Sequence, residues 1–355
     1  MKFVLYTNTL SAHQIPLAKE VVRLIGPDHF RYIYTSKSGQ KLQESDASDE
    51  WIRYAPGGDP EGWLENADIM LVGGLRPIGL MERRLAAGRT TLYMSERWFK
   101  PMQICRVLNL PGWVRLLVPS YWKMARRFAM LFKSKHYRFL PIGPWSLFDM
   151  KKICGIMKVP LLDKQVIKWG DFVAPSKFDA LPVQEASNEV RVLWVGRLLN
   201  LKRVDTIVRA VGEHANLKRV DNSLPTITLD IYGSGPEEKH LKRMAAKYGD
   251  AIKFHLPVSI DEVRKLMREH DVYVLASNGY EGWGAVVSEA LEEGMKVIGT
   301  YEAGASAAIL PESNLFHSGD WKTLRNMLAC GVPFVPIGEW SAKSATKRLF
   351  SELEL

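Results

Sequence analysis

The hydrophobic positions of the chain fall into short apolar runs that alternate with longer segments of helical spacing. Runs rich in β-branched and aromatic residues predict strands in the first half at 2–6, 29–34, 67–72 and 90–94. Similar runs predict strands in the second half at 190–196, 226–232, 252–255, 271–276 and 296–300. Because strands that alternate with helices assemble into parallel sheets, the pattern predicts an α/β fold of the doubly wound type.

The length of the chain predicts two domains, because 355 residues exceed what one ordinary hydrophobic core covers. The run at 169–176 predicts the last strand of the first domain. Residues 177–189 have no clear periodicity and predict a linker. We therefore expect a first domain at 1–176, a second domain at 190–340 and a terminal helix at 341–355.

The composition is typical of a folded soluble protein. The chain is 46% apolar and 25% charged, and no stretch reaches the roughly 18 uninterrupted apolar residues of a membrane span. Polar residues follow the first apolar run too closely for a signal peptide. The three cysteines, Cys105, Cys154 and Cys330, are widely spaced without a CxxC grouping. They predict reduced thiols in a cytosolic protein and no zinc site.

The net charge of +9 is concentrated in one segment. Residues 97–148, called here the basic aromatic segment, contain ten Lys or Arg and no Asp or Glu. The sequence therefore predicts a local basic surface instead of a uniformly basic protein.

A helix is predicted inside the basic aromatic segment, with Ser120 as its N-cap. Helical spacing places Tyr121, Met124, Ala125, Phe128, Leu131 and Phe132 on one face and Lys123, Arg126, Arg127 and Lys133 on the other. Either the apolar face packs on a sheet, or the segment rests on anionic lipid headgroups, which attract basic and aromatic side chains. Nucleic acid is disfavoured, because no RNA- or DNA-binding motif accompanies the segment.

Loops at the carboxyl ends of the first-half strands predict a ligand-binding rim, because doubly wound sheets bind ligands at that edge. The rim comprises Thr7 to His13, Gly73-Gly74 and Ser95-Glu96-Arg97. His13 is either a substrate contact or a merely solvated loop histidine.

Two acidic residues mark the second half. Glu281 follows the strand at 271–276 within a glycine-bearing loop, and Glu289 lies about two turns along the helix that begins near Ala285. The loop points free backbone N–H groups, those of Gly284 and Ala285, towards the space above the sheet, which suits phosphate. The alternative is a loop carboxylate and a helix carboxylate that are both solvated.

Two cations follow the strand at 190–196. Arg197 and Lys202 lie in a loop between that strand and a helix. A guanidinium and an ammonium at this place grip a diphosphate and stabilise the charge that grows on a leaving nucleotide. The alternative is two exposed cations without a ligand.

These two motifs, Gly196-Arg197 with Lys202 and Glu281-Gly-Trp-Gly with Glu289-Ala290, together resemble the signature of retaining glycosyltransferase family four. The resemblance is strongest over 190–328. It implies the GT-B architecture: two facing Rossmann-like domains with parallel sheets and a C-terminal helix that crosses back to the first domain. The segments Leu10 to His13 and Glu302 to Ala305 depart from the glycine-rich loops of the family.

The resemblance also assigns roles to residues. It implies that Arg197 and Lys202 hold the diphosphate, that Glu289 binds the ribose and that Glu281 contacts the donor sugar near the reacting carbon. It further implies nucleotide contacts at Gly196, Gly233, His255, Gly284 and Ala285. For Gly233, in the turn Gly233-Ser234-Gly235-Pro236, the alternative is a tight turn with no ligand.

We therefore expect a retaining, metal-independent hexosyltransferase whose UDP- or GDP-linked sugar is a substrate, with no cofactor. The basic aromatic segment adds a glycan or lipid-linked acceptor and an anionic membrane surface as expected partners. The enzyme would then lie in the cytoplasm, on the inner face of the cell membrane, and synthesise a cell-surface polysaccharide. A sugar-nucleotide epimerase, a phosphorylase and a non-catalytic sugar-nucleotide-binding or membrane-surface-binding protein remain alternatives.

Overall fold

The structure is a computed structural model that describes residues 1–37, 48–59, 61–74, 76–100, 102–104, 108–110, 112–178 and 188–354. The chain divides into two compact units. Unit 1 comprises Met1–Ala174 and Glu339–Leu355, and unit 2 comprises Pro175–Gly338. The predicted linker at 177–189 lies largely outside the described residues.

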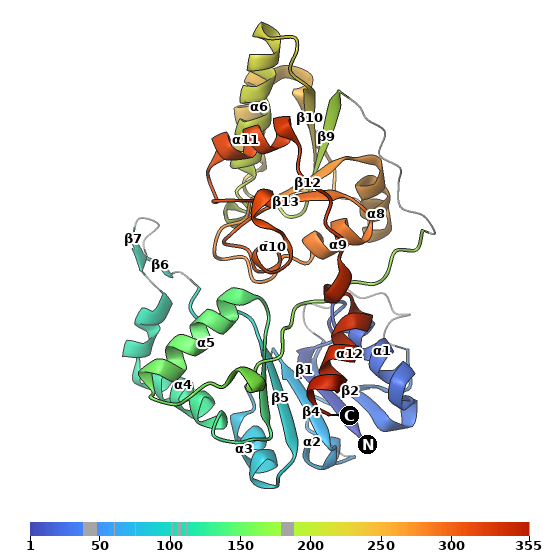
Figure 1. Ribbon diagram of the computed structural model, residues 1–355, viewed down its shortest axis with the longest axis vertical. Helices are drawn as coiled ribbons and strands as arrows, with labels where there is room; N and C mark the ends of the chain where they lie inside the picture. Colours follow the sequence, from blue (N-terminus) through green and yellow to red (C-terminus); the bar gives the residue numbers. More distant parts are fainter. Residues whose placement is uncertain are drawn as a thin grey trace. The chain divides into compact units, whose positions relative to one another are not determined.

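Unit 1 is built on a parallel sheet of six strands (Figure 1). The strand order is β3 (Ile52–Tyr54), β2 (Phe30–Ser36), β1 (Phe3–Thr9), β4 (Ile69–Gly73), β5 (Thr90–Ser95) and β8 (Tyr137–Pro141). Side chains of β1 alternate between two cores, with Phe3 and Leu5 on one face and Val4 on the other. The sheet is therefore buried on both faces, as a parallel sheet requires.

Helices cover both faces of this sheet. The first face carries α1 (Ile15–Ile25) and α12 (Ala342–Glu352). The second carries α2 (Trp63–Asn66), α3 (Ile78–Ala86), α4 (Pro119–Leu131) and α5 (Pro144–Ile156). The shorter elements are η1 (Pro27–His29), η3 (Gly112–Leu117), η4 (Asp163–Gln165) and the antiparallel pair β6 (Met102–Ile104) and β7 (Leu108–Leu110).

The C-terminal helix belongs to unit 1. Ser341 caps α12, since its hydroxyl accepts a hydrogen bond from the Ser344 amide at 3.2 Å. Ala345 and Leu349 are buried in the core that Phe3 also joins, and the Phe350 ring stacks on the Phe3 ring. The predicted return of the last helix to the first domain is confirmed.

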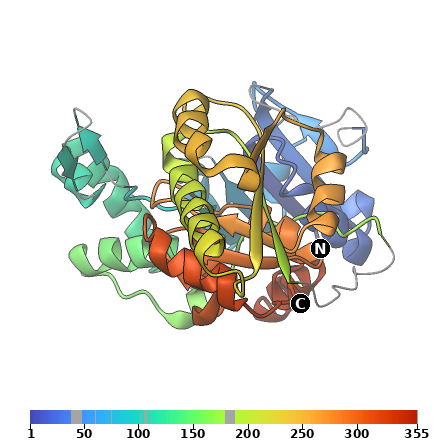
Figure 2. The ribbon, with the colours of Figure 1, turned by 90° about the horizontal axis from the view of Figure 1, so that it is seen from above.

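Unit 2 repeats the same architecture, with strand order β11 (Ile252–His255), β10 (Thr226–Tyr232), β9 (Glu189–Val195), β12 (Val272–Leu275), β13 (Lys296–Thr300) and β14 (Leu315–Phe316). One face carries α6 (Val204–Val220), α7 (Glu238–Ala245) and α11 (Trp321–Cys330), with α6 and α11 side by side in Figures 1 and 2. The remaining helices are α8 (Ile260–Glu269), α9 (Val286–Glu292) and α10 (Gly304–Ile309). Short turns are η5 (Asn200–Lys202), η6 (Ala246–Ala251), η7 (Glu312–Asn314) and η8 (Gly338–Trp340).

Both sheets share one connectivity. In each, the first strand lies at the centre between the second and the fourth, so the direction of winding reverses beside it. Doubly wound sheets bind ligands at the carboxyl ends of the strands beside such a reversal. The predicted fold class, α/β with two Rossmann-like parallel sheets, is confirmed.

Two predictions about unit 1 are wrong. Residues 169–176 form no strand; Trp169 makes only an isolated bridge to Ile142. The sixth strand is β8, inside the basic aromatic segment, where Tyr137 and Phe139 are buried on either side of Arg138. Ser120 is also not an N-cap, because α4 already begins at Pro119, whose fixed φ suits the first turn.

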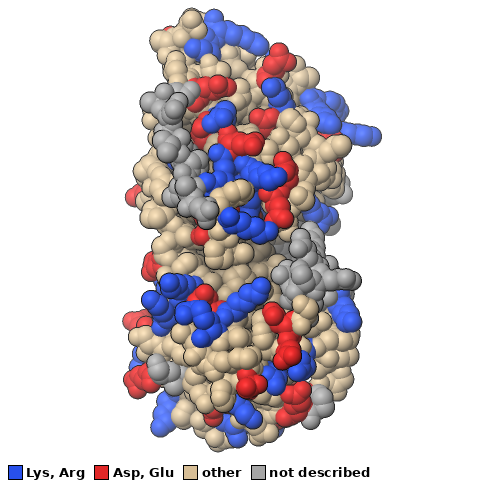
Figure 3. Space-filling model, turned by 90° about the vertical axis from the view of Figure 1, so that its right-hand side faces the viewer, with Lys and Arg blue, Asp and Glu red and all other residues tan. Residues whose placement is uncertain are grey.

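Helix α4 packs on the sheet. Ala125, Phe128, Leu131 and Phe132 are buried in the second core of unit 1. The first interpretation of its apolar face is therefore correct. Among the described residues, none of the helices is both long and apolar enough to cross a membrane. On the face drawn in Figure 3, basic and acidic side chains are interspersed.

Candidate functional site

The loops after β9 and β12 meet at the point where the winding of unit 2 reverses. The loop after β9 contains η5 and ends at Lys202. The loop after β12 is held against it because the Asn278 amide donates a hydrogen bond to the Leu201 carbonyl at 2.9 Å. This contact fixes Lys202 and Glu281 relative to each other at the carboxyl edge of the sheet.

Lys202 and Glu281 form an ion pair. Lys202 Nζ lies 2.5 Å from Glu281 Oε2, and the two side chains are only 22% and 14% exposed. Ser277, which is fully buried, donates its hydroxyl hydrogen to the same Glu281 oxygen at 2.9 Å. Among the described residues, Glu281 Oε1 has no hydrogen-bond partner and the Lys202 ammonium donates only to Glu281.

Glu281 and Glu289 both raise the pKa of one buried phenol, that of Tyr273. Tyr273 of β12 is buried and donates to the Val195 carbonyl at 3.2 Å. Burial raises its pKa, and the negative charges of Glu289 and Glu281 raise it further. The two acids, eight positions apart in sequence, therefore lie near the same end of β9.

Arg197 is exposed at the start of the same loop. Among the residues that the structure describes, its guanidinium has no hydrogen-bond or ion-pair partner. The Gly284 and Ala285 amides likewise have no acceptor within the described chain, and they lie at the beginning of α9. The structure thus brings Lys202 into contact with Glu281 and leaves Arg197 and these two amides available.

The glycines after β9 and β10 hold two loops together. A Cβ at Gly233 would lie 1.9 Å from the Gly196 carbonyl oxygen, and one at Gly235 would lie 2.4 Å from the Leu198 carbonyl oxygen. The Leu198 amide also donates to the Ser234 carbonyl at 2.9 Å. This backbone packing accounts for glycine at Gly233 without a ligand.

The His255 side chain has partners within unit 2. Its ring stacks on Tyr232 at 4.3 Å, and its Nε2 lies 2.5 Å from Asp230 Oδ1. His270 approaches the other Asp230 oxygen at 3.4 Å. Its hydrogen bond is the largest contribution that lowers the pKa of the Asp230 carboxyl, and His255 lowers it further. His255 lies at the end of the edge strand β11, and its carbonyl accepts from the Gly233 amide at 3.3 Å.

The rim predicted in the first half lines a cavity of about 440 Å³. The cavity lies over the carboxyl ends of β1, β4 and β5, where the winding of unit 1 reverses. Its lining is mostly polar and comprises Thr7, Asn8, Thr9, Ser11, His13, Gln14, Gly73, Gly74, Arg76, Tyr93, Met94, Ser95, Glu96, Arg97, Ile142 and Asp171. We call it the unit 1 cavity.

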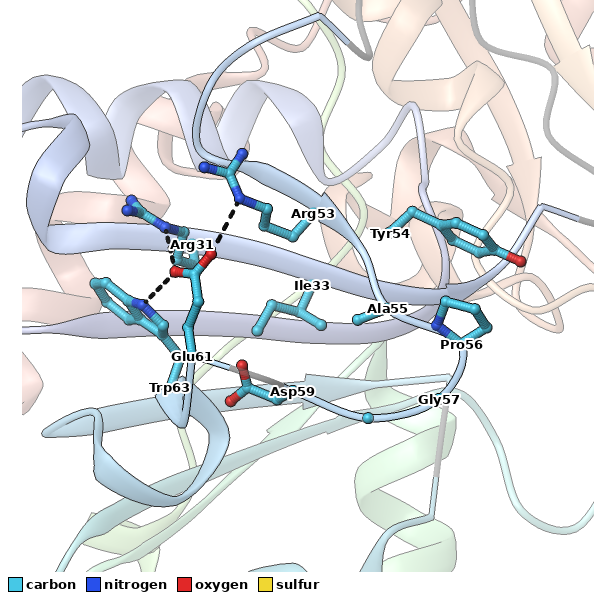
Figure 4. A pocket seen from close by; sticks show the side chains of 11 residues that line it. Arg31, Ile33, Arg53, Tyr54, Ala55, Pro56, Gly57, Asp59, Glu61 and Trp63 are labelled. Atoms are coloured by element: carbon cyan, nitrogen blue, oxygen red, sulfur yellow. Dashed lines mark hydrogen bonds and ion pairs between the residues drawn. The ribbon is translucent and has the colours of Figure 1, made fainter.

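A larger recess of about 520 Å³ opens at the β3 edge of unit 1 (Figure 4). Its charged groups are bonded to one another: Glu61 accepts from Arg53 at 3.4 Å and from the Trp63 indole at 3.0 Å, and lies 3.5 Å from Arg31. Asp59 holds the Leu64 amide. Because these charged groups bond to one another, fewer of them are available to a ligand in this recess than in the unit 1 cavity.

Within the described residues, no three His, Cys, Asp or Glu side chains gather in a cluster that could hold a metal ion.

Comparisons with known proteins bear on the fold. Residues 178–329 match the family model described as "Glycosyl transferases group 1". Across the whole chain, the fold is similar to that of the apo form of the lipopolysaccharide outer core galactosyltransferase WaaB. That likeness has a TM-score of 0.66 at 13% identity and covers 100% of this chain and 99% of that one. The chain has the GT-B glycosyltransferase fold.

A second GT-B neighbour is Anabaena HepE in complex with UDP, with a TM-score of 0.60 at 14% identity over 100% of this chain and 95% of that one. Among curated proteins, the chain is 32% identical over 108 residues to the GtfA subunit of the UDP-N-acetylglucosamine–peptide N-acetylglucosaminyltransferase of Streptococcus pneumoniae. The aligned part is 30% of this chain and only 20% of that protein. The GtfA subunit of Streptococcus gordonii is 32% identical over 117 residues, 33% of this chain and 21% of its own length.

The chain spans about a fifth of the length of these curated relatives. The family match and the GtfA relatives indicate a glycosyltransferase. Assignment to family four, which the two motifs predict, stays a prediction.

Sequence reasoning missed several residues around these sites. Ser277 and Asn278 fix the position of Glu281, although they looked like ordinary loop residues. In unit 1, Asp171 and Gln14 were missed. The signal for Asp171 was a lone acid within the apolar run 169–173, which would have been costly in a fully buried strand.

Proposed function

We propose that this protein is a retaining glycosyltransferase of hexosyltransferase type that transfers a sugar from a nucleotide-sugar donor to a glycan or lipid-linked acceptor. The observation that carries the proposal is the Lys202–Glu281 pair at the carboxyl edge of the unit 2 sheet. It places an ammonium and a carboxylate of the two motifs at one point where Rossmann-like sheets bind nucleotides.

The donor diphosphate binds to Arg197 and Lys202. Lys202 has three N–H donors and gives one to Glu281, so it can bind phosphate oxygens without losing its partner. Arg197 supplies a planar guanidinium from the same loop. The Gly284 and Ala285 amides add donors beside them, and Glu289 accepts hydrogen bonds from the ribose hydroxyls.

These cations act on the leaving group. The bond between the anomeric carbon and the diphosphate oxygen breaks, and its electron pair passes to the diphosphate, whose growing charge Arg197 and Lys202 stabilise. The acceptor oxygen bonds to the anomeric carbon on the same face, and the hydroxyl proton leaves with the diphosphate. Glu281 contacts donor-sugar hydroxyls. Because two cations neutralise the diphosphate, the proposal requires no metal.

The identity of the donor base rests on similarity. The GtfA relatives carry UDP-N-acetylglucosamine in their names, and the HepE neighbour was solved with UDP. We therefore take a UDP-linked hexose as the first donor to test, before GDP-linked sugars.

The acceptor side includes a membrane surface. In the basic aromatic segment, Leu117, Val118 and Trp122 are 76%, 52% and 40% exposed at the start of α4, and Trp113 and Phe148 are exposed on the neighbouring elements η3 and α5. Exposed Lys123 and Arg126 lie on α4 beside them. Apolar and aromatic side chains among cations suit anionic lipid headgroups, where each cation contributes about 1 kcal/mol.

This surface supports a lipid-linked acceptor and a place on the cytoplasmic leaflet, in the synthesis of a cell-surface polysaccharide. Trp98, Phe99, Tyr137 and Phe139 do not belong to it, because they are buried.

Nucleotide release tests the proposal. The purified chain is incubated with UDP-glucose, UDP-galactose, UDP-N-acetylglucosamine and GDP-mannose, with and without a lipid extract as the acceptor source, and all products are separated. We expect release of nucleoside diphosphate and a sugar transferred with its anomeric configuration kept. A changed donor sugar without any acceptor would indicate an epimerase instead, and donor binding without turnover would indicate a binding protein.

A further inference from the structure

Asp171 is held at the edge of the unit 1 cavity by neighbours on both sides. The following residue, Phe172, is buried and donates its amide hydrogen to the His13 carbonyl at 3.1 Å. This bond ties the Asp171 backbone to the loop after β1. Gln14, from the same loop, donates its side-chain amide to Asp171 Oδ1 at 3.3 Å. The carboxylate is therefore fixed in place over the sheet.

No cation forms an ion pair with Asp171 among the described residues, and its only hydrogen bond there is the one from Gln14. Asp171 Oδ2 is left without a donor, and the side chain lines the cavity. Burial raises the pKa of this carboxyl to about 6. Asp171 is partly buried, and a partly buried carboxylate that the fold does not pair is costly, so its position in the cavity points to a ligand.

Gln14 supplies a second open acceptor. Its side chain is only 4% exposed, and its Oε1 has no hydrogen-bond partner among the described residues. Gln14 lines the same cavity as Asp171. Two neighbouring oxygens that only accept hydrogen bonds suit a ligand that donates them, and neighbouring hydroxyl groups do so.

The charges around the cavity favour a neutral ligand. Arg97 lies 3.6 Å from Asp149, and the Arg76 guanidinium stacks over Trp98 at 4.5 Å, so both cations have partners of their own. Glu96 pairs with Lys100 at 3.0 Å, so Asp171 is the carboxylate of the lining that lacks an ion-pair partner among the described residues. A phosphate or carboxylate would meet the Asp171 carboxylate as a like charge, whereas a saccharide would not.

We propose that Asp171 and Gln14 form the binding site for the neutral, hydroxyl-rich end of the acceptor, a saccharide, and that Asp171 accepts a hydrogen bond from the hydroxyl that it orients. The site rests on the proposed function for its role in transfer, but binding of a saccharide can be measured without turnover.

This site titrates. The groups that face Asp171 are His13, whose charge lowers the carboxyl pKa, Glu96, whose charge raises it, and Tyr32, whose own pKa is raised mainly by burial and slightly by Asp171. Below a pH of about 6 the carboxyl takes up a proton. It then no longer accepts a charge-assisted hydrogen bond, so saccharide binding weakens as the pH falls through this value.

Saturation-transfer NMR on the full chain tests the site, with glucose, galactose and N-acetylglucosamine as probes. Wild type, Asp171→Asn and Gln14→Met are compared above and below the carboxyl pKa, with Asp163→Asn, an exposed carboxylate on η4, as the matched control. We expect wild type and control to bind a probe above this pKa and both variants to bind about tenfold more weakly. Wild-type binding should fall below it.

Equal binding by Asp171→Asn and wild type would overturn the proposal, and so would a wild type that binds none of the three sugars. If Asp171→Asn fails to fold, saccharide binding by Gln14→Met tests the proposal instead. UDP binding, followed by thermal shift, separates this proposal from the proposed function. UDP binding with no sugar binding would defeat the acceptor site alone, whereas sugar binding with no UDP binding would defeat the donor assignment.

Discussion

Lys202 Nζ and Glu281 Oε2 lie 2.5 Å apart, although 79 positions separate the two residues in sequence. The pair joins the loop after β9 to the loop after β12, where the winding of the sheet reverses. Since both side chains are mostly buried, the pair is screened little by solvent, and removing one partner leaves the other charge uncompensated.

Lys202→Ala should lower the rate of donor turnover. Loss of a cation at the leaving diphosphate costs about 100-fold in kcat/KM. Steady-state nucleotide release measures the effect, with thermal unfolding to show that the variant is folded. Lys265→Ala on α8 is the matched control, because that ammonium is 56% exposed and pairs only with Glu262. Equal losses in both variants would contradict the assignment of Lys202.

Gly233→Ala should destabilise unit 2 whether or not a nucleotide is present. Its Cβ would overlap the Gly196 carbonyl oxygen at 1.9 Å, and we expect a loss of about 3 kcal/mol in the free energy of unfolding. Gly155→Ala on α5 meets open space and should be neutral or stabilise by up to ~1 kcal/mol. Denaturant unfolding measures both. A Gly233→Ala protein of normal stability that loses nucleotide binding would make Gly233 a ligand contact instead.

Asp171→Asn should stabilise the protein at neutral pH. Because the folded-state pKa is raised from 3.8 to about 6, the native state binds the proton more tightly than the unfolded state does. The contribution of Asp171 to the free energy of unfolding of wild type is therefore complete near pH 4. It is lost as the pH rises through about 6, by at most ~3 kcal/mol.

The amide side chain cannot ionise, so the difference in melting temperature between Asp171→Asn and wild type should be positive above this pKa and should shrink towards pH 4. Thermal unfolding across the pH range measures it. A variant that is less stable than wild type at neutral pH would show that Asp171 is structural.

Replacing Leu117 and Trp122 by Ser should reduce binding to anionic vesicles. Both side chains are exposed at the start of α4. Burying the apolar surface of each one in the lipid interface contributes about 1.5–3 kcal/mol to the free energy of binding. Co-sedimentation with phosphatidylglycerol and phosphatidylcholine vesicles measures it. Leu256→Ser, at an exposed leucine of unit 2, is the control. The surface would be excluded if wild type bound neither vesicle, or both equally.

The sequence was sufficient for strands whose apolar pattern is regular. The predicted strands 226–232, 252–255 and 296–300 coincide with β10, β11 and β13. In these segments local propensity and tertiary packing favour the same structure, so the local sequence pattern alone predicts the elements.

The sequence was insufficient where tertiary contacts decide. The run 169–176 has the composition of a strand and its Trp169 and Phe172 are buried, yet β8, with Tyr137 and Phe139 buried, takes the edge of the sheet. The two motifs predicted that Lys202 and Glu281 serve one ligand. Their direct ion pair, and the supporting bond from Ser277, depend on loop contacts that no local pattern encodes.

The central claim is that Arg197, Lys202, Glu281 and Glu289 bind one nucleoside diphosphate sugar. Calorimetric titration with UDP measures this most directly, on wild type, Arg197→Ala, Lys202→Ala and the unit 1 variant Asp171→Asn. We predict that wild type and Asp171→Asn bind UDP with equal affinity and that each cation variant binds at least about tenfold more weakly. Folded cation variants with wild-type affinity would contradict the claim, as would a folded wild type that binds neither UDP nor GDP.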